Sequence, residues 1–280
     1  MNRTIMKVAI LSTPVCPYTV DIIKHFKAND FVIDAVIIEQ DIRKKYSKNE
    51  LIFRNAHDKF NRKFKKYSLS RRITRRVWDN LVPKFIKNYI QKNIETIPII
   101  KKVATKNFAE QNGVPVFSTK KHSGEDVKKF LIENKIDYLL LASSNWLLKE
   151  PLLGTDLYKI ISIHPGLLPK YKGLDSLQWT IKEGGKIGNT AFFVNKDLDG
   201  GAILKFYEEP ILEGDSTAII QRRMTSKKPE IYLDILKGLE NKSIIPKKQS
   251  GSEKPLQPMS FEQLLEVEHI LQERIEKQKL

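Results

Sequence analysis

The stretch that decides the fold is Ile160-Ile161-Ser162-Ile163-His164-Pro165-Gly166-Leu167-Leu168-Pro169. Residues 159–164 form an apolar run typical of a buried strand, and Pro165 directs the chain out of the sheet after His164. In open α/β sheets the carboxyl ends of the strands carry the ligand site. The imidazole of His164 is therefore a candidate for chemistry, while a histidine that ends a strand for structural reasons fits the local pattern as well.

Strands and helices alternate on both sides of this stretch, which predicts an α/β fold with an open, mostly parallel, doubly wound, Rossmann-like sheet. The longest predicted helices are Ser216–Glu240 and Phe261–Gln278, and Ser260 with Gln263 forms a capping-box pattern before the second. The other predicted strands are Lys7–Ser12, Val32–Glu39, Val114–Phe117, Asp137–Ala142, Asn189–Val194 and Ala202–Glu208, and the other predicted helices are Tyr18–Phe26 and Gly124–Asn134.

The predicted domain covers residues 1–245 and contains a helical insertion over residues 41–106. A polar stretch rich in Pro, Gly, Ser and Lys, residues 246–258, follows and reads as a linker, so we assign residues 246–280 to a linker and a C-terminal helix.

The insertion carries nearly all the net charge of the chain. The sequence has 49 Lys and Arg residues against 33 Asp and Glu residues, a net charge of +16, and Arg43–Lys106 alone has 20 basic and four acidic residues. Arg71, Arg72, Arg75 and Arg76 lie along one flank of a predicted helix. This charge fits an anionic partner, which could be a nucleotide, RNA or an anionic membrane surface. It equally fits a face that makes the protein soluble and binds no partner.

Composition favours a cytoplasmic protein with a sizeable core. Hydrophobic residues make up 41% of the chain, and the single cysteine, Cys16, excludes an intrachain disulfide. We expect no transmembrane segment, because the longest apolar run, Tyr138–Leu148, is broken by polar residues. The N-terminus reads as a strand and not as a signal peptide. The oligomeric state has no signal in the sequence.

A second candidate segment is Asp197-Leu198-Asp199-Gly200-Gly201, which follows a predicted strand. Paired glycines allow positive φ angles and close backbone approach, so a carboxylate beside them can be held in a fixed direction. An ordinary Asp-Gly turn is the alternative interpretation.

Together these two motifs, in this order and spacing, resemble the folate-dependent formyltransferases, a family that includes methionyl-tRNA, sugar-nucleotide and glycinamide ribonucleotide formyltransferases. The family motifs are Asn-x-His-Pro-Ser-Leu-Leu-Pro and Asp-x-Gly, and the resemblance covers roughly residues 5–40 and 107–240. It implies an enzyme that transfers a formyl group from 10-formyltetrahydrofolate to an amine. No metal is expected.

By this resemblance His164 hydrogen-bonds the formyl oxygen, and Asp199 holds the imidazole, favours its protonated form and helps to move the proton. The pteridine is held largely by main-chain groups in this family. The matching positions here are Trp146, Leu147, Leu148, Asn195, Lys196, Asp197 and Leu198.

One position departs from the family pattern, since Ser162 stands where the family has its catalytic Asn. A serine hydroxyl is a shorter and rotatable donor, and removing one oxyanion donor costs about 3 kcal/mol. The change keeps open a non-catalytic RNA- or membrane-binding protein with a vestigial pocket. Gly166 in place of the family Ser is expected to change mainly backbone freedom.

The acceptor is expected to be a small, nucleotide-linked amine such as an amino sugar. Pro14 and Pro17 remove amide donors from the turn after the first strand, which argues against a phosphate-binding loop of the glycinamide ribonucleotide enzymes. The 40 residues after Glu240 are too few for the C-terminal barrel of methionyl-tRNA enzymes. A formyltetrahydrofolate hydrolase, which normally has an N-terminal regulatory domain, remains an alternative.

Overall fold

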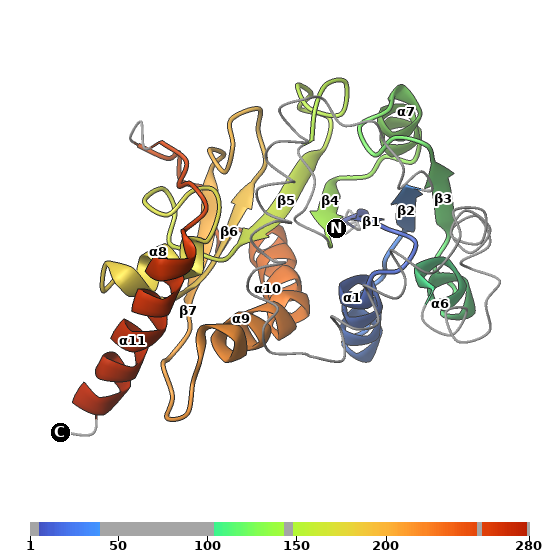
Figure 1. Cartoon of the computed structure of the whole chain (residues 1–280). Coiled ribbons are helices and arrows are strands. Elements are labelled where there is room, and N and C mark those ends of the chain that lie inside the picture. Colours follow the sequence, from blue (N-terminus) through green and yellow to red (C-terminus); the bar gives the residue numbers. More distant parts are fainter. Residues whose placement is uncertain (1–5, 40–103, 143–147, 251–253, 279–280) are drawn as a thin grey trace, which may run out of the picture.

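The computed structural model describes residues 6–39, 104–142, 148–250 and 254–278. They form a seven-stranded sheet in the order β3-β2-β1-β4-β5-β6-β7 (Figure 1). The strands are β1 (Val8–Ser12), β2 (Ala35–Glu39), β3 (Val116–Thr119), β4 (Tyr138–Leu141), β5 (Lys159–His164), β6 (Gly188–Phe193) and β7 (Ile203–Glu208).

The five strands from β3 to β5 are parallel, and the central strand β1 pairs Ile10 with Val36 on one side and Leu140 on the other. Strands β6 and β7 extend the sheet in antiparallel orientation. All residues of β1 and β2 are buried, as expected for parallel strands covered on both faces. The predicted open, mostly parallel α/β fold is confirmed.

Two predicted strands have boundaries that are wrong by two or three residues. Strand β2 begins at Ala35 and not at Val32, which is 67% exposed. Strand β3 spans Val116–Thr119, whereas Val114–Phe117 was predicted. Pro115 has no amide hydrogen to donate and contributes only its carbonyl, which accepts from the N–H of Val36.

Helices and loops cover the two faces of the sheet with separate hydrophobic clusters. One face packs against α1 (Pro17–Ala28), α6 (Thr105–Gln111) and α10 (Lys228–Glu240). The other packs against α7 (Glu125–Glu133) and the loop over residues 148–158. Helix α6 was not predicted, and its seven residues carry little apolar periodicity.

The predicted helix Ser216–Glu240 is two helices, α9 (Thr217–Ser226) and α10. Pro229 occupies the first turn of α10, where its missing N–H is not needed, but in a continuous helix it would leave a carbonyl of α9 without its donor. The break places the first turn of α10, with Lys228, against the body of the molecule.

A third hydrophobic cluster joins α9 to α8 (Ser176–Lys182) and α11 (Phe261–Lys277). Helix α11 packs along α8, as Figure 1 shows in red and yellow. The predicted capping box is confirmed, since Ser260 and Gln263 each accept a hydrogen bond from the other's backbone N–H.

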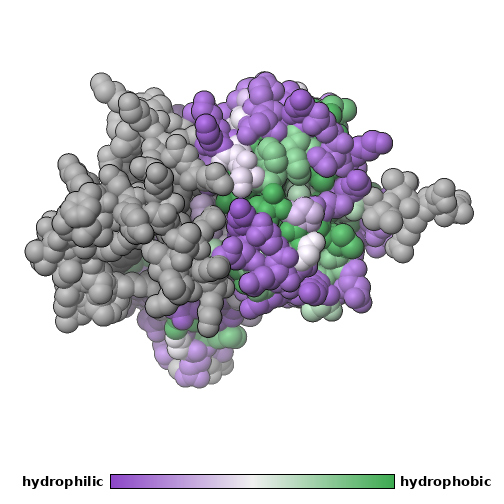
Figure 2. All heavy atoms as spheres, turned by 90° about the vertical axis from the view of Figure 1, so that its right-hand side faces the viewer, coloured by the Kyte–Doolittle hydropathy of each residue, from purple (hydrophilic) through white to green (hydrophobic). Residues whose placement is uncertain are grey.

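The predicted insertion over residues 41–106 lies outside the described residues except for its last three positions. Within the described part of the chain, no helix is long and apolar enough to cross a membrane. Figure 2 looks at the side that carries β3, α6 and α7, where hydrophobic side chains lie among hydrophilic ones outside the grey region.

Candidate active site

Ser162 and His164 lie on the same face of β5, at the carboxyl end where a ligand site was predicted. Their neighbours Ile161 and Ile163 alternate with them and pack into the cluster under α1 and α10. Ser162 is 8% exposed and His164 is 6% exposed. The Ser162 hydroxyl forms no hydrogen bond with the described residues, so its donor is free for a ligand.

The two nitrogens of His164 face different partners. Nε2 lies 2.5 Å from the carbonyl oxygen of Tyr171, and Nδ1 lies 3.5 Å from Oδ2 of Asp199. A carbonyl oxygen only accepts, so Nε2 must carry a hydrogen. Nδ1, beside the carboxylate, is therefore the nitrogen that gains or loses the titrating proton.

Burial lowers the pKa of His164 below its ordinary value of 6.5. The Asp199 carboxylate opposes this shift, as does the hydrogen bond to Tyr171, whereas the charge of Lys228 adds to it. Asp199 thus raises the pKa of His164, but desolvation by burial lowers this pKa by more. The imidazole is thus neutral at neutral pH and able to accept a proton at Nδ1.

The loop that carries Asp199 is a fixed turn. Asp199 has a φ of +49°, in the left-handed region, and a Cβ on Gly201 would lie 1.7 Å from the Phe193 carbonyl oxygen. The N–H of Gly173 donates to Oδ2 of Asp199 at 3.0 Å. These contacts hold the carboxylate with Oδ2 at 3.5 Å from Nδ1 of His164.

Gly166 lets the chain fold back over the imidazole. A Cβ at this position would lie 3.1 Å from both the Cβ and the carbonyl oxygen of Tyr171, the residue that holds Nε2 of His164. The glycine thus affects packing beside the catalytic candidate, in addition to the backbone freedom expected from the sequence.

The predicted folate-binding positions fall into two groups. Asn195, Lys196, Asp197 and Leu198 form an exposed loop between β6 and Asp199. The N–H of Asp197 donates to Oδ1 of Asn195 at 3.0 Å, which shapes this loop. Leu148 is buried in the core, and Trp146 and Leu147 lie outside the described residues.

Lys228 is part of the site's electrostatics and was missed in the sequence. It lies in the first turn of α10, four residues before Tyr232, whose hydroxyl donates to the Leu141 carbonyl at the end of β4 (2.6 Å). Lys228 is 8% exposed and forms no hydrogen bond or ion pair with the described residues. Burial lowers its pKa from 10.5 to about 8.

The turn after β1 is occupied by protein contacts. The N–H of Cys16 donates to Oγ1 of Thr105 at 2.9 Å, and the N–H of Thr105 donates to the Pro14 carbonyl at the same distance. This arrangement agrees with the expectation that the turn offers few amide donors to a phosphate.

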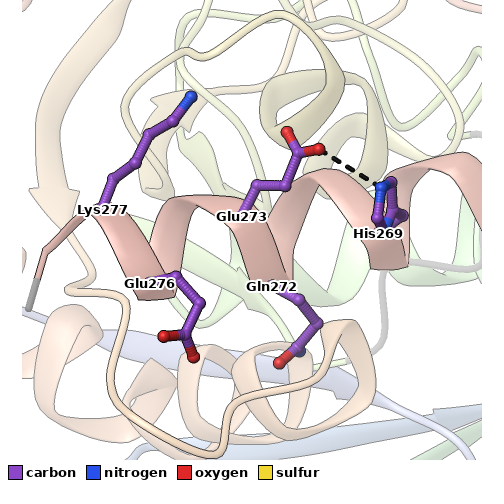
Figure 3. A pocket seen from close by; sticks show the side chains of 5 residues that line it. All are labelled: His269, Gln272, Glu273, Glu276 and Lys277. Atoms are coloured by element: carbon purple, nitrogen blue, oxygen red, sulfur yellow. Dashed lines mark ion pairs between the residues drawn. The ribbon is translucent and has the colours of Figure 1, made fainter.

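Two other polar features lie apart from these residues. His122, for which the sequence showed no partner, is buried with Nδ1 at 3.0 Å from Oε2 of Glu39, at the end of β2. Figure 3 shows a hollow lined by α11 side chains alone, in which His269 pairs with Glu273 at 3.2 Å. Neither feature shares a residue with the site around His164.

Comparison with known proteins gives a consistent result. The family model described as formyl transferase matches residues 86–236. A phosphoribosylglycinamide formyltransferase of Haemophilus influenzae is 33% identical over 122 residues, 43% of this chain and 58% of the relative. A methionyl-tRNA formyltransferase of Clostridium perfringens is 26% identical over 165 residues, 58% of this chain and 53% of the relative.

A sugar N-formyltransferase from Shewanella sp. FDAARGOS_354 has a similar fold, with a TM-score of 0.52 at 16% identity, covering 95% of this chain and 86% of that one. The chain spans a little over half the length of the phosphoribosylglycinamide and methionyl-tRNA formyltransferases named above. The family model matches more than half of the chain and includes both Ser162 to His164 and Asp199. The chain belongs to the formyl transferase family.

Proposed function

We propose that this protein transfers a formyl group from 10-formyltetrahydrofolate to the amine of a small acceptor. The observation that carries the proposal is the arrangement at the end of β5. There the buried imidazole of His164 faces the carboxylate of Asp199, and the hydroxyl of Ser162, which is unpaired among the described residues, lies on the same face.

The residues present suit the folate donor. The exposed loop over residues 195–198 offers backbone groups directly before Asp199, and the free Ser162 hydroxyl supplies a donor on the same face as His164. When bound, 10-formyltetrahydrofolate supplies the formyl carbon that the acceptor amine attacks.

His164 acts on the proton of the acceptor amine. Its Nδ1 accepts the proton as the amine nitrogen bonds to the formyl carbon, and Asp199 stabilises the resulting imidazolium at 3.5 Å. The imidazolium would then return this proton to the donor nitrogen as the bond between that nitrogen and the formyl carbon breaks. Ser162 donates to the carbonyl oxygen on which negative charge develops, in the place of the family Asn. Tyr171 holds the ring through Nε2 throughout.

This assignment sets the direction of the pH dependence. A base must be unprotonated to act, and the pKa of His164 lies below 6.5 because of burial. The rate therefore rises with pH through the acidic range and reaches a plateau at neutral pH.

For the acceptor we propose a small amine linked to an anionic group, such as a nucleotide-linked amino sugar. The basic segment over residues 43–106 has the charge to attract such a group, and Lys228 adds a buried cation near His164. Methionyl-tRNA and glycinamide ribonucleotide are the acceptors named for relatives, and both are also anionic. Binding of RNA by the basic segment is likewise a proposal.

The test is incubation of the purified protein with 10-formyltetrahydrofolate and a panel of amines, with tetrahydrofolate release and formylated product both measured. The panel contains nucleotide-linked amino sugars, glycinamide ribonucleotide, methionyl-tRNA and uncharged amines. Formylation of an anionic amine supports the proposal. Tetrahydrofolate release without any formylated amine would identify a hydrolase. The absence of both products would contradict catalysis.

Charge reversal at Arg71, Arg72, Arg75 and Arg76 tests the basic segment. If this segment attracts the anionic acceptor, the reversal raises the acceptor KM, more strongly at low ionic strength, and leaves folate affinity nearly unchanged. An unchanged KM would contradict this role.

A further inference from the structure

Residues 246–250, which the sequence assigns to a linker, run beside the loop that carries Asp199. Lys247 and Ile203 exchange two backbone hydrogen bonds, each 2.8 Å long, and form a bridge at the start of β7. This bridge places the side chain of Gln249 against the turn. Its Nε2 donates to the carbonyl oxygens of Asp199 at 2.8 Å and Gly201 at 2.6 Å.

One amide group therefore binds two backbone carbonyls of the turn that contains the carboxylate, those of Asp199 and Gly201. The Asp199 backbone has a positive φ, a region that residues with a side chain visit uncommonly, and neighbouring contacts help to hold it there. Among the described residues, the Gln249 amide is the side chain that hydrogen-bonds to the Asp199 carbonyl. Movement of this turn would change the 3.5 Å separation between Asp199 Oδ2 and His164 Nδ1.

Residues 254–258 position the second group that contacts the Asp199 carboxylate. The N–H of Leu256 donates to the Lys172 carbonyl at 2.8 Å, and the N–H of Leu174 donates to the Leu256 carbonyl at 3.2 Å. Gly173, between them, donates its N–H to Asp199 Oδ2. A Cβ on Gly173 would lie 2.8 Å from the Leu256 carbonyl oxygen, so the two backbones touch closely.

We propose that Gln249 is a positioning residue, which holds the Asp199 turn so that the carboxylate faces His164 Nδ1. The expected effect of Gln249 on the rate rests on the function proposed above. Its expected effect on the His164 imidazole is argued from the contacts in the structure and does not depend on the reaction. It makes residues 246–250 part of the active site, although Gln249 lies 50 residues from Asp199 in the chain.

The test compares Gln249→Met, which keeps the length of the side chain and removes the amide donor, with the matched control Gln257→Met. Gln257 lies in the same C-terminal stretch, and within the described part of the chain its side-chain amide hydrogen-bonds to the nearby Pro255 carbonyl alone, at 3.4 Å. The His164 pKa is measured by NMR of ¹⁵N-labelled histidine, and thermal unfolding is recorded for each variant. Asp199→Asn serves as the reference for complete loss of the carboxylate charge.

Asp199 raises the pKa of His164, so loosening its turn should lower that pKa in Gln249→Met, toward the value in Asp199→Asn. The Gln257→Met variant should keep the wild-type value. We further expect a loss in kcat of about tenfold to a hundredfold in Gln249→Met, as for misplaced catalytic groups generally. Gln249→Asn, which retains the donor on a shorter side chain, is measured alongside in case the Met variant folds poorly.

An unchanged His164 pKa in folded Gln249 variants would overturn the inference, even if their stability falls, because a purely structural contact would lower stability alone. Wild-type protein that formylates no amine, together with a His164 pKa that responds to Gln249, would instead contradict the proposed function and leave the positioning role supported.

Discussion

Replacement of Lys228 by methionine should stabilise the protein. The Lys228 ammonium lies buried in the first turn of α10, is 8% exposed and is unpaired among the described residues. Its pKa is lowered from 10.5 to about 8 by burial. Because one pKa unit corresponds to about 1.4 kcal/mol, the charged form costs about 3 kcal/mol in the folded state. Methionine is apolar, similar in length and carries no such cost.

The pH dependence of this gain has a definite sign. A lysine whose folded pKa is lowered binds its proton more weakly in the folded state, so its cost is fully present below pH 8. It disappears as the pH rises from 8 toward 10.5, where the unfolded chain also loses the proton. Lys228→Met should therefore be about 3 kcal/mol more stable than wild type at pH 7 and less than about 1 kcal/mol more stable at pH 10.

Urea unfolding at both pH values measures the difference, with Lys237→Met as the control. Lys237 is an exposed residue of the same helix, and its replacement should change stability by no more than about 0.5 kcal/mol. A Lys228→Met variant without any gain at pH 7, or with an equal gain at both pH values, would refute the burial of an unpaired ammonium at this position.

Three further predictions concern the same region. Lys228→Met should raise the His164 pKa and Asp199→Asn should lower it, since the two charges act on the imidazole with opposite signs, and an NMR titration showing shifts of the same sign would contradict this. Ser162→Ala should lower kcat by up to about a hundredfold while Ser162→Asn equals or exceeds wild type, and full activity of Ser162→Ala would exclude the hydroxyl as an oxyanion donor. Tyr232→Phe removes the buried hydrogen bond to the Leu141 carbonyl, which should lower the free energy of unfolding by about 1 kcal/mol; unchanged urea unfolding would contradict it.

The sequence was informative where a local pattern reflects the structure. The apolar run that stops at Pro165 identifies both the strand β5 and its last residue His164, because proline cannot continue a sheet. The capping box at Ser260 is equally local, and the start of α11 agrees with it. Pro229 is also a local signal, because proline favours the first turn of a helix and so marks the start of α10.

The contacts that complete the site join residues far apart in the chain and have no local signal. Gln249 lies in a stretch whose composition is that of a linker, yet its amide binds a turn 50 residues away. His122 and Glu39 meet across 83 residues. Lys228 resembles any surface lysine in sequence, and its burial follows only from the tertiary packing around the first turn of α10.

The central claim, that His164 and Asp199 carry formyl transfer, is tested most directly with 10-formyltetrahydrofolate labelled with ¹³C in the formyl group. Appearance of the label on the acceptor amine is followed for wild type, His164→Ala and Asp199→Ala, with circular dichroism confirming that each variant is folded. We expect transfer by the wild-type protein and a loss of at least about a hundredfold in each variant. Transfer at the wild-type rate by both folded variants would contradict it.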